Sequence, residues 1–382
     1  MTDFSFHNPT QILFGLNKEE QIGTLLKEDG ITSVLLVYGG GSIIRSGLYA
    51  RITDNLAQAG ITRYEHGGVQ SNPVLSHTRK GIDLVREKHI DAVLAVGGGS
   101  VIDESKAIVV GAMGEADVWE YYTGRPIEAA LPLYTILTLP ASASEMNGNS
   151  VLTNEATRQK YSFKSLLAYP RTSIINPDLM KSVPREYIAY SAVDIITHVL
   201  ESYFTHTNET PLQNYFVEGI VKTVMETTPA LLEGDADYDA WAQFAWSATM
   251  GLNGVARAGM ENDLFANHMI EHSLSALNNI PHGAGLAVVL PAWMRWYLPR
   301  HTAPFQRFAA QVFGPTCSPE CGIDSLQSWF GSIGAPTTMQ ELGLDASHID
   351  AIAENAAQTA VLWGVSETYT KEIISTILKG AL

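Results

Sequence analysis

The sequence predicts a two-domain protein, with an α/β domain over residues 1–183 and an all-helical domain over residues 184–382. Three observations predict this fold class. A chain of 382 residues exceeds the size of one ordinary hydrophobic core. An apolar share of 46% with 17% charged residues is typical of a globular protein. Short runs rich in branched residues alternate with amphipathic segments up to about Asn176, and strand-like runs stop after Pro184.

The first domain is expected to contain a parallel sheet covered on both faces. Nearly continuous apolar strands separated by helices are typical of that arrangement. Residues 73–89 form one expected helix, with Asn72 as a candidate cap and Pro73 as the first helical residue. The expected strands are QILFG, SVLLVY, DAVLAV, LYTILTL and TSIIN.

The second domain is expected to consist of successive helices. Its apolar residues recur at helical rather than strand spacing. The expected helices cover roughly residues 185–205, 211–230, 238–256, 263–276 and 283–298, with several more to the C-terminus.

Charge and composition exclude several partners. The formal net charge of -16 repels polyanions, which argues against nucleic acid or an anionic membrane. No apolar run approaches the ~18 residues needed to cross a bilayer, and the N-terminal segment lacks the build of a signal peptide. We therefore expect a cytoplasmic protein. In that compartment Cys317 and Cys321 are expected to be reduced thiols, and without a second pair they do not predict a metal site.

The tetrapeptide GGGS occurs twice, each time where a strand gives way to a helix. It covers residues 39–42 after SVLLVY and residues 97–100 after DAVLAV. Glycine lets backbone N–H groups approach a phosphate, and the following helix adds its positive end. Neither triplet fits the G-x-G-x-x-G fingerprint, so a plain strand-to-helix turn stays open for each. The second is the stronger candidate because Asp103 and Lys106 follow on its helix.

A third strand end carries hydroxyl groups. The segment TLPASASE offers Thr138, Ser142 and Ser144 where LYTILTL ends. The carboxyl ends of parallel strands form the edge at which open α/β sheets bind ligands. Three glycine-rich or polar strand ends together favour a nucleotide as the ligand.

The helical half contains a candidate metal site. Asp194 and His198 are four residues apart and share one face of a helix. His268 and His272 have the same spacing, and His282 completes three histidines within fifteen residues. An isolated Asp-His pair is more often a surface pair or a core contact, but the additional histidines favour metal. Such a donor set suits Fe(II) or Zn(II), and one of the four histidines is left for another role.

The same segment permits a competing interpretation. His268, Glu271 and His272 spell H-x-x-E-H, a zinc peptidase pattern in which the glutamate activates water. That hypothesis leaves Asp194, His198 and the glycine turns unexplained. If the match is accidental, Glu271 is expected at a solvated helix position.

The chain resembles the iron-dependent alcohol dehydrogenase family, in particular its NADPH-dependent aldehyde reductase and butanol dehydrogenase branch. The resemblance covers nearly the whole chain and implies a Rossmann-like dinucleotide-binding domain before a helical metal domain, as in dehydroquinate synthase-like architecture. It rests on FSFHNPTQILFG, YGGGS, GGGSVIDESK, TLPASASE, DIITH and HMIEHSLSALNNIPHGAGLAVVLPAW, in the family's order.

The resemblance also assigns site residues. It implies that one divalent metal, iron or zinc, is bound by four ligands: Asp194, His198, His268 and His282. His272 then faces substrate and nicotinamide and is a candidate for relaying a proton. The implied cofactor contacts are Gly97, Gly98 and Ser100 at the pyrophosphate, Asp103 near the nicotinamide, and Thr138, Ser142 and Lys160 along the groove.

The first glycine triplet bears on the choice of cofactor. NAD-preferring relatives typically have an aspartate where this chain has Gly39, and the resemblance implies that Gly40, Gly41 and Ser42 donate hydrogen bonds to a 2'-phosphate. NADP(H) is therefore expected over NAD(H). The chain departs from the branch at two positions. The branch often has two adjacent basic residues just after this turn, whereas this chain has Ile44 and Arg45. Many relatives have glycine at the position of Ala143.

The resulting functional hypothesis is a metal-dependent oxidoreductase. It transfers hydride between NADP(H) and an aldehyde/primary alcohol pair, acts on short to medium-chain aldehydes, and forms a homodimer or a larger homo-oligomer, as family members do. The alternatives are a polyol dehydrogenase or dehydroquinate synthase-type enzyme of the same fold, the H-x-x-E-H zinc hydrolase, and a nucleotide-binding regulator without activity.

Overall fold

The computed structural model describes residues 1–234 and 236–382, and contacts within it divide the chain into two units. One unit is His7–Val183. The other combines Met1–Phe6 with Pro184–Leu382. The first six residues, which the sequence analysis counted with the α/β domain, join the helical unit because the backbone N–H of Thr2 donates to the carbonyl of Gly259 at 3.1 Å.

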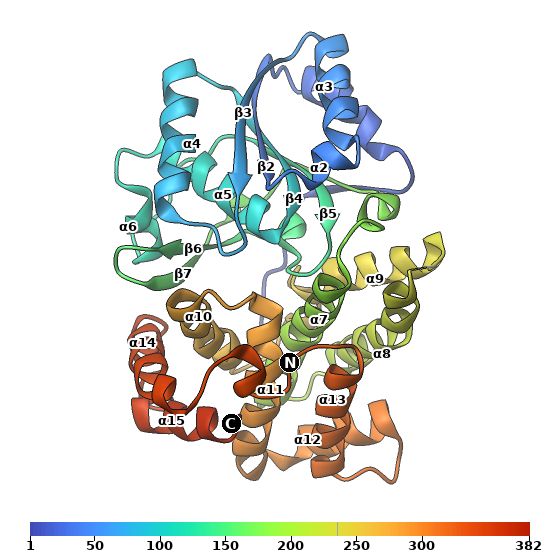
Figure 1. The fold of residues 1–382 in the computed structure, drawn as a ribbon, viewed down its shortest axis with the longest axis vertical. Helices are drawn as coiled ribbons and strands as arrows, with labels where there is room; N and C mark the ends of the chain where they lie inside the picture. The colour runs from blue at the N-terminus through green and yellow to red at the C-terminus, as the bar shows by residue number, and fades with distance from the viewer. Residues whose placement is uncertain (235) are drawn as a thin grey trace. The chain divides into compact units, whose positions relative to one another are not determined.

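The unit His7–Val183 is built on a six-stranded sheet, which confirms the expected α/β fold with a parallel sheet (Figure 1). All neighbouring strands run parallel, in the order β1-β8-β5-β4-β2-β3. The strands are β1 (Gln11–Phe14), β2 (Ser33–Gly39), β3 (Thr62–Val69), β4 (Ala92–Gly98), β5 (Leu133–Leu139) and β8 (Thr172–Ile175).

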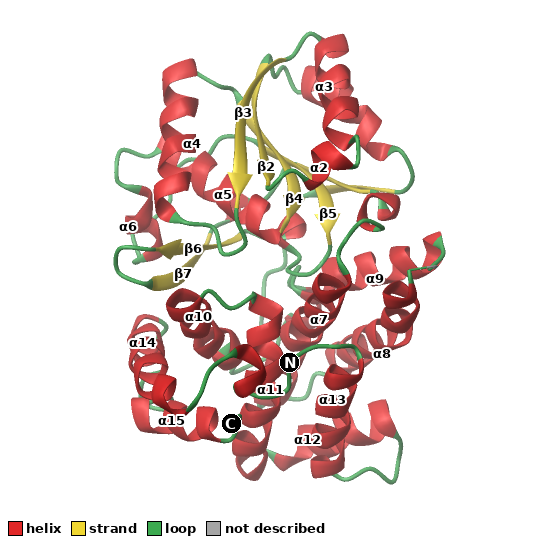
Figure 2. Ribbon diagram, viewed as in Figure 1, coloured by secondary structure: helices red, strands yellow, loops and turns green. Residues whose placement is uncertain are grey.

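Helices lie on both sides of these strands (Figure 2). The apolar runs make this necessary, because strands buried on both faces need two covering layers. The helices are α1 (Ile22–Glu28), α2 (Ser42–Arg45), α3 (Leu48–Ala59), α4 (Leu75–Lys88), α5 (Gly99–Met113) and α6 (Val118–Tyr122).

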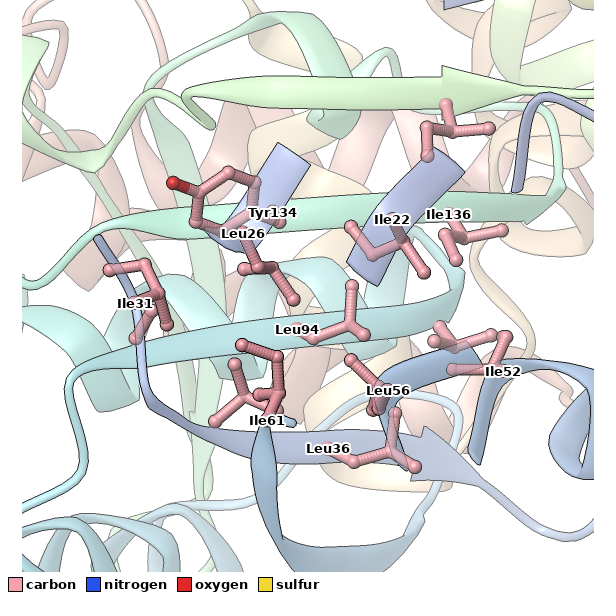
Figure 3. Packing of buried hydrophobic residues seen from close by; sticks show 14 of the residues in the cluster. Ile22, Leu26, Ile31, Leu36, Ile52, Leu56, Ile61, Leu94, Tyr134 and Ile136 are labelled. Carbon is pink, nitrogen blue, oxygen red and sulfur yellow. The ribbon is translucent and has the colours of Figure 1, made fainter. Parts of the chain in front are cut away.

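The core of this unit follows from strand register. Leu36 of β2 is paired with Leu94 of β4, which is paired with Tyr134 of β5, so their side chains share one face. These side chains pack on α1 and α3 in one buried cluster (Figure 3). Leu35 and Val93 alternate with them and are also buried, on the face that α5 covers. Burial on both faces explains the continuous apolar runs of the sequence.

One strand of the sheet was missed by the sequence analysis. Strand β3 reads TRYEHGGV and lies at the edge of the sheet, where most of its residues stay at least partly exposed. It therefore lacks the apolar run that marks the central strands.

A second difference concerns the start of α4. The helix begins at Leu75, with Val74 as its cap, so the prediction of Asn72 as cap and Pro73 as first residue was wrong. Val74 forms an isolated bridge with Thr153, whose N–H donates to the carbonyl of Pro73. These contacts, with the antiparallel pair β6 (Asn149–Asn154) and β7 (Gln159–Lys164), delay the helix by two residues.

The described part of the unit that contains Pro184–Leu382 is helical, as expected. Its α-helices are α7 (Arg185–Thr205), α8 (Pro211–Glu233), α9 (Tyr238–Gly251), α10 (Ala266–Asn278), α11 (His282–Tyr297), α12 (Thr302–Phe308), α13 (Pro319–Ser332), α14 (Ile349–Leu362) and α15 (Lys371–Lys379). Among the residues that the structure describes, no helix combines the length and apolar character that crossing a membrane requires.

A disulfide joins Cys317 to Cys321, so the expectation of reduced thiols was wrong. Cys317 lies in the turn before α13, and Cys321 lies in the first turn of that helix. This local geometry sets the two Cα atoms 5.5 Å apart, a separation that a disulfide readily spans.

Candidate functional site

Three helices of one unit carry the predicted metal ligands. Asp194 and His198 lie one turn apart on α7. His268 lies on α10, and His282 is the first residue of α11. Helix α11 packs tightly on α7 at its N-terminal end, because a Cβ added at Gly283 would meet the backbone of α7 only 2.2 Å away. That close approach brings His282 to Asp194.

Asp194 is the common neighbour of three imidazoles. Its Oδ1 lies 3.4 Å from Nδ1 of His198, and 3.6 Å from Nε2 of both His268 and His282. Ligand atoms of Asp194, His268 and His282 all lie within 4.8 Å of one another. His198 is not part of that trio, but its ring stacks on that of His268 with centroids 4.5 Å apart.

The residues fit a divalent metal. In the described part of the chain, Oδ1 of Asp194, Nδ1 of His198 and Nε2 of His268 are buried without a hydrogen-bond partner. Leaving buried polar atoms unpaired is costly, and coordination to a metal would remove that cost. One carboxylate with imidazoles and no thiolate is a donor set that both Fe(II) and Zn(II) accept.

The charges of the site also favour a bound cation. Burial alone raises the pKa of Asp194, but the neighbouring imidazoles hold it below its ordinary value. Burial lowers the pKa of His198 to about 3. Burial also disfavours charged His268, yet the carboxylates of Glu201 and Asp194 raise its pKa to about 9. The carboxylates thus attract positive charge, which a proton or a metal ion supplies.

Two buried glutamates orient two of the histidines. Nδ1 of His268 donates to Glu201, and Nδ1 of His282 donates to Glu271. Glu271 is fully buried and also accepts from the hydroxyl of Ser275, so the expectation of a solvated position was wrong. A hydrogen bond at Nδ1 fixes the ring and directs Nε2 toward a metal position.

Glu271 and His272 also bear on the peptidase interpretation. Glu271, His272 and His282 place one possible ligand atom each within 4.8 Å of one another. Both carboxylate oxygens of Glu271 already accept hydrogen bonds, which does not favour a role as general base. His272 is buried one turn after His268, with its ring edge-on to Trp363 at 6.1 Å. This places a titratable group beside the proposed ligands.

A pocket of about 290 Å³ lies beside these histidines. The ring of Phe265 lies 5.3 Å from that of His268, and Trp363 is the neighbour of His272. The lining is largely apolar and aromatic: Asp263, Leu264, Phe265, Ala266, Met269, Trp363, Val365 and Tyr369. The pocket therefore suits a small apolar molecule with a polar end.

The first GGGS turn joins β2 to α2. Gly39 is the last residue of β2, and Gly41 has φ 99°, a conformation that glycine adopts without strain. Gly40 and Ser42 are exposed. A Cβ on Gly41 would lie 3.5 Å from Nη1 of Arg45, so this guanidinium lies against the turn. The turn thus offers exposed backbone next to one cation.

The second GGGS turn joins β4 to α5 and is tightly packed. A Cβ on Gly97 would lie 2.5 Å from Val101, and one on Gly99 would lie 2.2 Å from the hydroxyl of Ser142. The chain's own packing therefore requires these glycines, whether or not a phosphate binds. The contact brings Ser142, from the third strand end, to the turn that contains Gly98 and the first helical residues up to Ser100.

Asp103 is engaged within the protein. Its carboxylate accepts from the hydroxyl of Ser144 at 2.5 Å and from the N–H of Val151 at 3.0 Å. Burial raises its pKa. Lys106 is fully buried and also donates to Ser144, at 2.8 Å. Both residues tie α5 to the segment that follows β5.

Thr138 and Lys160 lie on separate strands. Thr138 is the next-to-last residue of β5 and is partly buried. Lys160 of β7 is buried and donates to the side-chain oxygen of Asn72 at 2.9 Å. Asn72 adopts a left-handed conformation with φ 56° just before α4. Lys160 thus links the hairpin to the loop between β3 and α4.

Glu201 is a site residue that the sequence analysis missed. It lies three residues after His198 and seven after Asp194, the spacing of one helical face. This spacing was a signal in the sequence. Glu271 was expected either as a catalytic base or at a solvated helix position, although its position three residues after His268 places it on the same face.

The fold and the site together define the class of metal-dependent dehydrogenases that bind a dinucleotide. Residues 9–177 match the family described as iron-containing alcohol dehydrogenase, and residues 188–382 match the C-terminal part of the Fe-containing alcohol dehydrogenase family. The chain belongs to the iron-containing alcohol dehydrogenase family, as its motifs implied. Membership implies an oxidoreductase with a nicotinamide cofactor and a divalent metal.

Curated relatives match over most of their length. The probable NADH-dependent butanol dehydrogenase 1 of Bacillus subtilis is 40% identical over 390 residues, covering 100% of both chains. The NADPH-dependent aldehyde reductase YqhD of Escherichia coli is 34% identical, covering 92% of both. Among solved structures, NADH-dependent butanol dehydrogenase A from Thermotoga maritima superimposes with a TM-score of 0.97 at 41% identity, covering 100% of this chain and 99% of that one.

Proposed function

We propose that this protein reduces short to medium-chain aldehydes to primary alcohols with NADPH, in a reaction that depends on one divalent metal. The observation that carries the proposal is the convergence of Asp194 and three histidines beside a largely apolar pocket. Four residues would hold the ion: Asp194, His198, His268 and His282. When bound, an Fe(II) or Zn(II) ion supplies Lewis-acid chemistry toward a carbonyl oxygen.

The chain's own residues prepare the site for this reaction. Glu201 and Glu271 hold His268 and His282 in the orientation that presents Nε2. His272 is the candidate for delivering a proton to the developing alcohol, because imidazole titrates near neutrality and this ring is next to His282, at 5.7 Å between centroids. The mainly apolar side chains of the lining would leave few polar groups to compete for the reacting carbonyl.

The pocket supports the proposed substrate class. Phe265, Met269, Trp363 and Val365 offer mainly hydrocarbon surface. An aldehyde with an alkyl chain gains from burial there, whereas a polyol or a phosphorylated sugar would lose water without finding matching donors. The pocket therefore favours aldehydes over the polar substrates of other enzymes with the same fold.

The α/β unit supplies the cofactor site in this proposal. The second GGGS turn, at residues 97–100, with Ser142 beside it, would receive the pyrophosphate. Thr138, Lys160 and Asp103 complete the proposed groove, Asp103 by fixing the backbone around Val151.

The choice of NADP(H) over NAD(H) is part of the proposal and rests on Gly39. A carboxylate at the end of β2 would repel a 2'-phosphate, and Gly39 carries none. Arg45 adds one cation against the neighbouring Gly41. The relatives' names include both NADH-dependent and NADPH-dependent enzymes, so we infer the cofactor preference from the residues of this chain.

Purified protein loaded with Fe(II) or Zn(II) tests the proposal directly. NADPH and NADH oxidation would be followed with straight-chain aldehydes from ethanal to octanal. We expect metal-dependent turnover, NADPH favoured over NADH, and a preference for longer chains in Trp363→Ala because that variant enlarges the pocket. Absence of turnover with every aldehyde and both cofactors would contradict the proposal, with His268→Ala as the metal-deficient control.

A further inference from the structure

A second histidine-carboxylate cluster lies in the α/β unit. His66 comes from β3, His77 from α4 and Glu104 from α5, three elements that lie side by side (Figure 1). One possible ligand atom from each lies within 4.8 Å of the others. None of the three is among the proposed ligands of the Asp194 site, which belongs to the other unit. The cluster is therefore a separate candidate.

The cluster is built around a buried carboxylate. Nε2 of His66 lies 2.9 Å from Oε1 of Glu104, and Nδ1 of His77 lies 2.6 Å from the same oxygen. The two imidazole rings overlap with centroids 4.1 Å apart and planes at 31°. Two nitrogens thus converge on one oxygen from adjacent rings, the convergence that a shared ion requires.

The second oxygen of Glu104 indicates a missing ligand. In the described part of the chain, Oε2 is buried and has no hydrogen-bond partner, and the residue as a whole is fully buried. A buried carboxylate needs compensation at both oxygens, by hydrogen bonds or by a cation. Both imidazoles contact only Oε1, so a cation bound near Oε2 would give the second carboxylate oxygen a partner.

We propose that His66, His77 and Glu104 form a second metal site, for a divalent transition metal of the Zn(II) type. Two imidazoles and one carboxylate with no thiolate suit Zn(II), Co(II) or Cu(II) better than Mg(II) or Ca(II), which prefer oxygen. Three protein ligands leave a fourth position for water. His77 gives access to that position, because its side chain is 24% exposed while His66 and Glu104 are buried.

The adjustment needed for binding is small. Ligand atoms around a tetrahedral ion with bonds of about 2.1 Å are about 3.4 Å apart. The observed separations of 2.9 and 2.6 Å from Oε1 therefore need to widen by less than ~1 Å. The His66 ring lies against Gly81, where a Cβ would be only 3.1 Å from its Nε2, so the glycine accommodates the ring in this position.

A bound ion would connect the edge strand to two helices. β3 is the outermost strand of the sheet, and α4 follows it directly along the chain. Coordination of His66, His77 and Glu104 would stabilise the folded α/β unit, because the unfolded chain does not preorganise these ligands. The ion's effect is therefore expected on thermal stability.

Metal stoichiometry tests this inference in the full-length protein. Apo-protein would be equilibrated with Zn(II), passed through a desalting column and analysed for bound zinc. The variant Asp194→Asn/His268→Ala, which removes the other site, is expected to keep one equivalent and to melt at a higher temperature with Zn(II) than without it. Adding His77→Ala or Glu104→Gln to that background is expected to abolish both effects, whereas adding His7→Ala, an exposed histidine of the same unit, is not.

Two outcomes would contradict the proposal of a second metal site. If the Asp194→Asn/His268→Ala protein binds no zinc and its melting temperature does not respond, the cluster is a hydrogen-bonded contact and the proposal fails. If zinc stays bound after His77→Ala and Glu104→Gln, the ion lies elsewhere, which also overturns it. Co(II) added to the same variants gives an independent reading, because three nitrogen and oxygen ligands produce a tetrahedral visible spectrum that His77→Ala should remove.

Discussion

Nδ1 of His282, the first residue of α11, donates a hydrogen bond to the buried carboxylate of Glu271 on α10. Gly285 permits this contact, because a Cβ there would lie 2.8 Å from Cγ of Glu271. The relationship fixes which nitrogen of His282 is free for a metal. It also bears on the H-x-x-E-H pattern in this chain, since both carboxylate oxygens of the glutamate accept hydrogen bonds, one of them from a proposed ligand.

The first prediction concerns Glu271→Gln. An amide cannot provide the negative charge that holds the imidazole N–H, so the His282 ring loses its fixed orientation. We expect metal affinity to fall by about 10- to 100-fold and activity to recover at high metal concentration. Competition with a chromogenic chelator measures the affinity, and Glu226→Gln, an exposed position on α8, is the matched control. An unchanged affinity would rule out the orienting role.

Gly283→Ala tests the contact between α7 and α11. The added Cβ would meet the carbonyl oxygen of Tyr190 at 2.2 Å, and a backbone atom cannot rotate away. We expect α11 to shift, with a loss of roughly 1–3 kcal/mol in unfolding free energy and weaker metal binding. Gly219→Ala is the control, because that helical position has open space and should gain about 0.4–1 kcal/mol. Urea unfolding of the apo-proteins measures the stability of both variants. Equal stabilities would contradict the close contact between α7 and α11 at Gly283.

His268 and His272 lie one turn apart on α10 but should respond differently to substitution. His268→Ala removes a proposed ligand, so we expect loss of the metal at the Asp194 site and of activity together, while metal at the His66, His77 and Glu104 site stays bound. His272→Ala should keep one equivalent of metal at that site while turnover falls by about 10²- to 10⁴-fold, the usual contribution of a positioned acid. Measuring both the metal content and the steady-state kinetics of each variant distinguishes the loss of a metal ligand from the loss of a proton donor. Loss of metal in His272→Ala would make it a ligand instead.

Gly39→Asp tests the proposed cofactor preference. A Cβ at this position would lie 3.3 Å from the carbonyl oxygen of Val69, so an aspartate needs only a small local adjustment. Its charge should repel a 2'-phosphate and shift the ratio of kcat/KM values for NADPH and NADH toward NADH by at least tenfold. Gly39→Ala adds the same Cβ without charge and should leave the ratio nearly unchanged. A wild-type preference for NADH would contradict the interpretation of Gly39.

The central strands of the sheet were predictable because strands that are buried on both faces have continuously apolar sequences. Strands such as β2 and β4 are buried on both faces, and their sequences are continuously apolar. Edge strand β3 was not predictable in this way, because its partly exposed residues follow no apolar pattern. The start of α4 was set by the bridge between Val74 and Thr153, a contact between distant segments that local sequence rules do not contain.

The candidate site was predictable to the extent that its residues share helices. Spacing identified Asp194 with His198 and placed His268 on another helix. Glu201 has the right spacing too, but glutamate on a helix is normally exposed, and its burial follows only from tertiary packing. The pocket depends on Phe265 and Trp363, which are far apart in the sequence and meet only in the folded chain.

The last prediction concerns Lys106, whose ammonium is buried and donates to Ser144, Asn147 and the carbonyl of Asn149. Burial lowers its pKa from 10.5 to about 8. Between these values the unfolded chain binds a proton that the folded protein does not, so stability contributed at this site should increase as pH rises from 8 to 10.

Lys106→Met removes this titration and serves as the reference. We compare the free energy of unfolding of the unsubstituted protein with that of the variant. Their difference should increase, in favour of the unsubstituted protein, by up to about 1.4 kcal/mol per pH unit between pH 8 and 10. Below pH 8 the difference should become constant, because the lysine is then protonated in both states. Urea unfolding of the two apo-proteins at half-unit pH intervals measures the difference. A constant difference from pH 7 to 10 would mean that folding leaves the lysine's pKa unchanged, and that its three hydrogen bonds fully offset the cost of burying the charge.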